Sequence, residues 1–211
     1  MSSTVRAPRR DAVQNREALL AAARTVLNRD PEAPLDAIAA TAGLSRRAVY
    51  GHFATRDALL AELVDAGAAR VATAVDGVEH DDPVVELALL GRVVWDEVEH
   101  VRAMTQVAVR GPLQHRLAPT LGLLHARIAD AVGRAASAGT GRTDLDPDTV
   151  ARLIGGAAFT VLDESVRRPI ARDEGRRLVV LAGLGALGLG WRDAQRVLEA
   201  HRDLIVPEDG R

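Results

Sequence analysis

The sequence predicts an all-α protein with a small N-terminal head and a larger helical body. Apolar residues recur at intervals of three and four along most of the chain, whereas the apolar–polar alternation of a strand is hard to find. Polar segments that contain Pro, Gly or both interrupt this periodicity, for example at residues 28–34, 79–83 and 137–147. We therefore expect helices joined by short turns, with the head ending just before residue 79.

The composition excludes several classes of protein. The 211 residues include no Cys, which excludes disulfides, thiol catalysis and thiolate metal sites. The N-terminal segment has no apolar stretch behind its charges, and the longest uncharged apolar run, residues 178–191, is too short to span a bilayer. We therefore expect a cytoplasmic protein without a membrane partner.

The net charge of −2 hides an asymmetry along the chain. Residues 1–60 carry a net charge of +3 and the remainder carries −5, and every basic side chain is an Arg. A basic head on an acidic body is typical of a protein that meets an anion at one end only.

Four helices are expected in the head. Asp11 can cap the first, and Pro34 suits the first turn of a short second helix that ends at Gly43. Ser45 and Thr55 are good N-caps for a third and a fourth helix. The second and third helices form a helix-turn-helix, because Gly43 permits the tight turn between them. The apolar residues expected to hold these helices together are Ile38, Ala39, Leu44, Val49 and Phe53.

The third helix carries side chains that suit DNA. It is so short that its first turn is free to point away from the core. An Arg in the major groove can pair with guanine O6 and N7, and an Ala methyl can touch a thymine methyl. A phenol, an imidazole and a further guanidinium can reach phosphates. The residues expected to contact double-stranded DNA are Ser45, Arg46, Arg47, Ala48, Tyr50, His52 and Arg56.

Residues 33–63, APLDAIAATAGLSRRAVYGHFATRDALLAEL, resemble the DNA-binding domain of the TetR family of bacterial transcriptional regulators. The shared pattern is Ile-Ala, Ala-Gly-Leu-Ser, Val-Tyr-x-His-Phe and then a basic residue with Leu-Leu. The resemblance is strong over residues 11–64, and beyond them only length and helical content agree. It implies that the first turn of the third helix reads bases while Tyr50, His52 and Arg56 contact phosphates. Two departures are an Arg at position 56, where Lys is common, and Ala33-Pro34, where many members have Thr or Ser.

The body is expected to consist of long helices. They are predicted over residues 83–110, 119–138, 147–168 and 173–204, with a short piece at 112–118. The chain then divides into a flexible basic arm (1–10), a DNA-binding domain with its connecting helix (11–78) and an effector-binding and dimerisation domain (79–211). Arg6, Arg9 and Arg10 of the arm either enter a minor groove or stay solvated.

The body is expected to make a homodimer, because one half-site is too short to specify a gene and a twofold dimer reads two. The last two helices carry apolar stripes that suit a four-helix interface. The candidate contacts are Leu153, Gly156, Leu181, Leu184 and Trp191. The alternative is that both stripes pack only within one subunit.

The family resemblance also implies a small-molecule pocket among the middle helices. Few polar groups stand among the apolar ones there, so the unidentified effector is expected to be largely apolar. The candidate lining residues are Trp95, Met104, His125 and Phe159. Plain core packing is the alternative for each of them.

Two motifs suggest other chemistry and fail. GLGALG (183–188) matches a dinucleotide-binding pattern, but the alternating strands and helices that such a site needs are missing. DLDPD (144–148) resembles the start of a calcium loop, but Asp146 and Pro147 fit the cap and first turn of a helix better. We expect no metal, no cofactor and no enzyme activity.

The sequence thus favours a ligand-responsive transcriptional regulator. In this hypothesis a homodimeric repressor binds a palindromic operator and releases it when a small molecule fills the body. The alternatives are a ligand-independent or architectural DNA-binding protein and, more remotely, a nucleotide-dependent enzyme.

Overall fold

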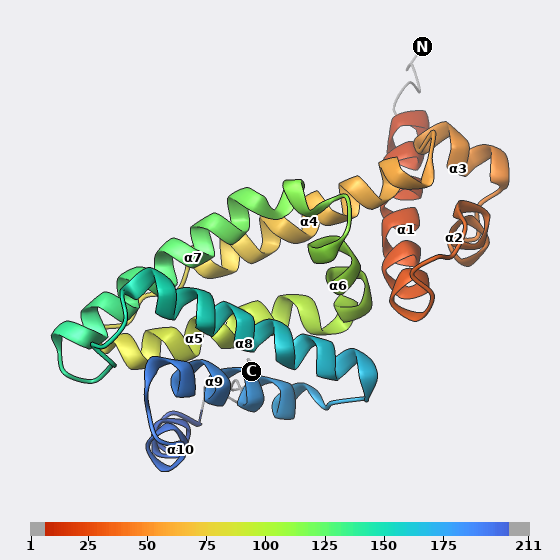
Figure 1. Ribbon diagram of the computed structural model, residues 1–211. Helices are drawn as coiled ribbons and strands as arrows, with labels where there is room; N and C mark the ends of the chain where they lie inside the picture. Colours follow the sequence, from red (N-terminus) through yellow and green to blue (C-terminus); the bar gives the residue numbers. More distant parts are fainter. Residues whose placement is uncertain (1–6, 203–211) are drawn as a thin grey trace.

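The computed structural model describes residues 7–202, and over that range the chain contains helices and turns but no strand (Figure 1). This confirms the predicted all-α class. The helices are α1 (Ala7–Arg29), α2 (Leu35–Thr41), α3 (Arg46–His52), α4 (Arg56–Asp76), α5 (Pro83–Val98), the short 3-10 helix η1 (Glu99–Val101), α6 (Arg102–Arg110), α7 (Gln114–Ser137), α8 (Pro147–Arg167), α9 (Arg172–Leu187) and α10 (Trp191–Ala200).

The helices form a head and a body that share α4. Helices α1–α3 lie together at one end of the molecule, and α4 leads from them into the body alongside α7 (Figure 1). Helices α5, α7, α8 and α9 pack against one another, and α10 lies against α9 at the end far from the head. Helix α6 contacts both α1 and α8, so it stands between head and body.

The turns of the head follow from local chemistry. Gly43 adopts a φ of +68°, which an L side chain rarely tolerates, and so ends α2 and starts the tight turn. The Ser45 hydroxyl accepts a hydrogen bond from the amide of Ala48 at 3.2 Å. The Thr55 hydroxyl accepts one from the amide of Ala58 at 3.1 Å. Both predicted N-caps are therefore confirmed.

The start of the head differs from the prediction. Helix α1 begins at Ala7, so residues 7–10, expected in a flexible arm, are its first turn, and Asp11 does not cap it. Arg6 and the rest of the arm lie outside the described residues. Pro34 is the N-cap of α2, one position before the helix.

Three predictions in the body are corrected. The helix expected over 83–110 is divided, because the backbone at Val101 (φ −128°, ψ 25°) leaves the helical region and turns α6 onto α1. The pieces expected at 112–118 and 119–138 form one helix, α7, which contains Pro119 near its start. The helix expected over 173–204 breaks at Gly188, whose φ of +108° ends α9.

The GLGALG segment lies in α9 and ends at this break. The residues before it, which would have to form a strand in a dinucleotide site, are helical. The nucleotide-dependent enzyme therefore lacks its structural context. Asp146 does cap α8, since its carboxylate accepts a hydrogen bond from the amide of Thr149 at 2.9 Å and Pro147 follows it as predicted.

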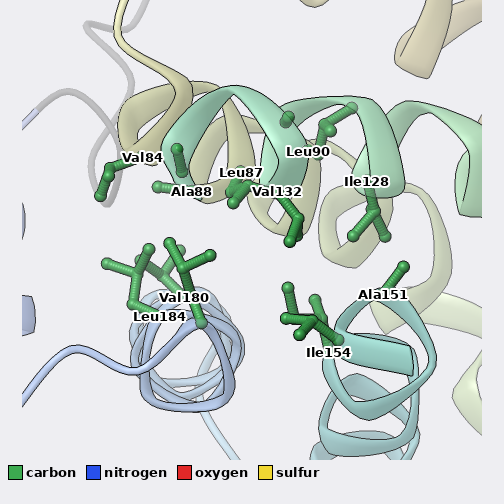
Figure 2. Packing of buried hydrophobic residues seen from close by; sticks show 14 of the residues in the cluster. Val84, Leu87, Ala88, Leu90, Ile128, Val132, Ala151, Ile154, Val180 and Leu184 are labelled. Carbon is green, nitrogen blue, oxygen red and sulfur yellow. The ribbon is translucent and has the colours of Figure 1, made fainter. Parts of the chain in front are cut away.

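The apolar side chains form two buried clusters. Figure 2 shows part of the body cluster, in which Leu87, Val132, Ile154 and Leu184 from four helices point toward a common interior. The head cluster joins apolar residues of α1–α4 and also takes in Val101 and Met104. The second cluster therefore crosses from head to body.

A buried carboxylate ties the far end of α4 to this framework. Glu86 of α5 is 4% exposed and forms ion pairs with Arg127, at 3.2 Å, and with Arg134, both on α7. Arg127 also donates hydrogen bonds to the carbonyl oxygens of Val75 and Val78, where α4 ends. The body end of α4 is thus fixed while its other end carries the head.

Trp95 is the largest fully buried side chain, and a glycine makes room for it. Its indole Nε1 donates to the carbonyl of Arg172 at 3.2 Å. A Cβ added to Gly175 of α9 would stand 1.9 Å from Cζ2 of the indole. Only Gly can occupy this position without displacing a rigid ring.

We predict that Gly175→Ala lowers the free energy of unfolding by about 1–3 kcal/mol, because the added methyl overpacks a rigid contact. The matched control is Gly122→Ala. Gly122 lies on the exposed side of α7, where an added Cβ meets nothing within 4 Å. That change should raise stability by up to about 1 kcal/mol, since Ala is the better helix former. Denaturant unfolding measures both, and equal stability of the two variants would contradict the contact.

Candidate DNA-binding face and candidate ligand cavity

Helix α3 presents the predicted DNA-reading side chains to solvent. Arg46, Arg47 and Tyr50 are exposed, whereas Val49 and Phe53 on the opposite side are buried. Figure 1 places α3 on the outer side of the head, away from the body. The structure therefore brings the predicted residues of the first turn together on one accessible surface.

The two Arg residues on this surface are held differently. Arg46 forms an ion pair with Asp36 of α2 at 3.4 Å, and its guanidinium carbon lies 5.7 Å from the centre of the Tyr50 ring. Arg47 is exposed, and among residues 7–202 it has no hydrogen bond or ion pair. Its guanidinium donors are free for an incoming base edge, whereas Arg46 is already oriented within the head.

Arg56 has a structural role that the sequence analysis missed. Its Nε donates to the carbonyl of Ala33 at 3.0 Å, and its Nη2 donates to the carbonyl of Pro31. These bonds close the α1–α2 turn, where two prolines remove backbone donors. The phosphate contact of Arg56 stays a prediction, as does that of the half-buried His52.

Arg16, like Arg56, has a structural role that no local sequence pattern indicated. Its guanidinium lies 4.5 Å from the centre of the Phe53 ring, and its Nε donates to Glu62 of α4 at 2.9 Å. Its Nη1 also donates to the carbonyl of His52 at 3.2 Å. One side chain of α1 thus fixes the end of α3 against α4, through partners far away in sequence.

The body contains a partly open cavity of about 490 Å³, within the usual range for small-molecule sites. Helices α4–α8 form most of the wall, with contributions from α1 and α9. All four candidate residues, Trp95, Met104, His125 and Phe159, border it. Trp95 and Met104 are also buried in the apolar core, so each of them both borders the cavity and packs within the protein.

Most polar groups on this wall are already bonded within the protein. Arg70 pairs with Glu97 at 3.0 Å, and the hydroxyl of Thr105 donates to the carbonyl of Val101 at 3.1 Å. His125 lies 3.2 Å from the carboxylate of Asp148. The remaining surface is largely aliphatic and favours an apolar occupant.

Helix α6 connects the cavity to the head. Met104 borders the cavity and belongs to the head cluster. The amide of Ala103 donates to the side chain of Asn28 on α1 at 3.1 Å. A displacement of α6 by a ligand would therefore reach α1 directly.

Helix α6 is also tied to α8. Asp163 of α8 accepts a hydrogen bond from Gln106 at 2.8 Å and pairs with Arg110. Burial raises the pKa of the Asp163 carboxyl, but these two hydrogen bonds outweigh it and hold the pKa below its usual value. The carboxylate is therefore ionised at neutral pH, and the link between α6 and α8 is intact there.

The candidate dimer contacts fall into two groups. Leu153 is 47% exposed and Trp191 is 64% exposed, with Gly156 exposed and Leu181 half-buried. Leu184 is 1% exposed in the core of one subunit, so it cannot present its side chain to a partner and that prediction is wrong. Helical spacing alone does not separate the inner from the outer side of α9.

Within residues 7–202, no group of three His, Asp or Glu side chains is arranged to hold a metal ion. No helix of the same range is both long and apolar enough to cross a membrane.

Comparisons with known proteins agree with this architecture. Residues 19–63 match the family model described as "Bacterial regulatory proteins, tetR family". The search of curated protein sequences gave no match. Among solved structures, the MbdR regulator from Azoarcus sp. CIB is similar with a TM-score of 0.68 and 17% identity, over 83% of this chain and 100% of MbdR.

Two other solved structures are also similar over most of their length. SmeT, the repressor of the Stenotrophomonas maltophilia multidrug efflux pump SmeDEF, has a TM-score of 0.62 and 24% identity, over 81% of this chain and 89% of SmeT. The TetR family transcriptional regulator PfmR from Thermus thermophilus has a TM-score of 0.63 and 18% identity, over 80% and 96% of the two chains. The helix-turn-helix head thus belongs to the TetR family of bacterial regulatory proteins, and the chain as a whole has the fold of a TetR-family transcriptional regulator.

Proposed function

We propose that this protein is a cytoplasmic, homodimeric transcriptional repressor. It binds a palindromic operator and releases it when a largely apolar small molecule fills the cavity. The observation that carries the proposal is the position of Met104, which packs in the core of the head and borders the cavity at once. A ligand-independent or architectural DNA binder has no use for such a cavity.

The DNA contacts follow from the exposed side of α3. Arg47 is free of partners in the described chain and can pair bidentately with guanine in the major groove. Tyr50 is 45% exposed, so its hydroxyl can reach a phosphate. Arg46 is held by Asp36 and must exchange that partner for a base or a phosphate.

A dimer supplies the second half-site. The exposed side chains of α8 and α9 lie in the body, apart from α3, so pairing there leaves both recognition helices free. Binding then requires the two α3 helices to stand about 34 Å apart, or a multiple of that distance. SmeT, which has the same fold, is a repressor, and this supports the proposed direction of control.

Ligand release works through differential affinity for two arrangements of the heads. A ligand in the cavity contacts Met104 and its neighbours, and α6 carries α1 with it through the hydrogen bond from Ala103 to Asn28. Because Asp163 also joins α6 to α8, a shift of α6 is transmitted both to α1 and to the proposed dimer surface on α8. The ligand favours the state in which the α3 helices are wrongly spaced.

Selection of bound duplexes from a random DNA pool tests the core of this proposal, and we expect a palindrome. The variant Arg47→Ala should lose about 1–3 kcal/mol of binding free energy and relax preference at one base pair per half-site. Arg168→Ala, an exposed Arg at the end of α8, serves as the control and should leave the selected sequence unchanged. A non-palindromic or unselective outcome would contradict the proposal.

The two aromatic residues of the recognition segment should respond differently to substitution. Phe53 is 2% exposed beneath Arg16, so Phe53→Ala should cost about 3–5 kcal/mol of folding free energy. Tyr50→Phe keeps the ring but removes the hydroxyl, so the head should stay folded and bind the operator about tenfold more weakly. Thermal unfolding and operator titration separate the two effects, and unchanged operator binding by Tyr50→Phe would remove Tyr50 from the contact surface.

Leu153→Glu should prevent dimerisation, because it replaces an apolar side chain of α8 that is 47% exposed with a charged one. Sedimentation should then show a monomer with weakened operator binding. Leu123→Glu makes the same change on α7, at a side chain 38% exposed, and should remain a dimer. If Leu153→Glu also stays dimeric, the interface lies elsewhere.

A further inference from the structure

Arg24 brings a positive charge from the DNA-binding head to the wall of the cavity. It lies on α1 one turn before Asn28, whose side chain is bonded to α6, so this side of α1 faces the body. Helix α1 indeed packs against both α6 and η1. Within the described part of the chain, no hydrogen bond or ion pair joins Arg24 to another residue.

The other charges on the wall are already compensated or bonded. Arg70 pairs with Glu97 at 3.0 Å. Arg152 of α8 donates to the hydroxyl of Thr149 at 2.9 Å. With Arg24 the described wall therefore holds three Arg and a single carboxylate, and Arg24 is the cation that retains its full donor capacity.

A cation of this kind beside an aliphatic cavity selects for one class of ligand. A guanidinium pairs bidentately with a carboxylate, and the pair is stronger where water is excluded. An apolar chain attached to that carboxylate would fill the aliphatic remainder of the 490 Å³. A cationic ligand would meet the positive wall and be rejected.

We propose that the cavity takes an amphipathic carboxylate, and that Arg24 binds its carboxylate group. The inference rests on the proposed function in so far as the cavity is the effector site. It adds a direct connection between ligand and head: the apolar part of the ligand contacts α5, α7 and α8, while its charge is bound by α1. The ligand then acts on the position of α1 without relying on α6 alone.

The binding test needs no DNA. Octanoate, decanoate and dodecanoate, each paired with the alcohol and the alkyltrimethylammonium ion of the same chain length, compete with a neutral apolar fluorescent dye for the full-length protein. We expect the best carboxylate to bind about tenfold or more tightly than its alcohol, with the cation weakest. Equal binding of carboxylate and alcohol, or no binding by any carboxylate, would overturn the proposal.

Variants assign the effect to Arg24. Arg24→Met keeps a flexible, unbranched side chain at this position and removes the guanidinium charge, so it should bind the alcohol nearly like the parent and lose the preference for the carboxylate. Arg24→Lys should restore part of that preference. Arg29→Met makes the same change on the exposed last turn of α1 and should keep it. Retained preference in Arg24→Met would overturn the assignment, and its binding of the alcohol reports that the cavity is folded.

An operator titration with the best carboxylate separates the two proposals. Release of DNA by the parent but not by Arg24→Met supports both of them. Arg24-dependent binding without any change in operator affinity supports the ligand assignment and overturns ligand-controlled repression.

Discussion

The insertion of Val101 and Met104 into the head cluster is the contact on which the arrangement of this molecule depends. The break between α5 and α6 turns these side chains toward α1. The apolar core of the head therefore includes side chains that belong to the body. A three-helix unit of this size buries little apolar surface by itself. Because residues of the body complete its core, the head is stabilised, and its packing depends on the position of α6. Any change in the cavity that moves α6 therefore changes the support of α3.

Polar contacts also join the helices that surround the cavity. Glu86, buried between Arg127 and Arg134, holds the body end of α4, and Asp163 holds α6 to α8. Removing one partner from such a buried pair is costly, since the other charge is left without compensation. The cavity lies between these contacts, and part of its wall is glycine: at Gly67 and Gly155 an added Cβ would meet nothing within 4 Å. Its volume is thus maintained by small residues on rigid helices.

The residues that could be predicted best from the sequence are those whose roles depend on backbone groups close to them in the chain. The caps Ser45, Thr55 and Asp146 and the left-handed Gly43 act within one turn of themselves, and all four were predicted. The joins between helices were harder to predict. The boundary predicted between residues 118 and 119 lies inside α7, whereas residues 99–101, which were predicted to continue a helix, interrupt it. Pro119 stands in the second turn of α7, where it removes one backbone donor without ending the helix, and the turn at residues 99–101 contains neither Gly nor Pro.

The sequence by itself determined the all-α class, the helix-turn-helix and the surface of α3, because periodicity, caps and motif spacing are properties of neighbouring residues. Tertiary structure alone decided which side chains of α9 face inward, so that Leu184 is buried while Leu181 is half-exposed. It also directed Arg56 to the carbonyls of Pro31 and Ala33 and brought Arg24 to the cavity wall. These assignments join residues on different helices, and their geometry exists only once the helices have packed.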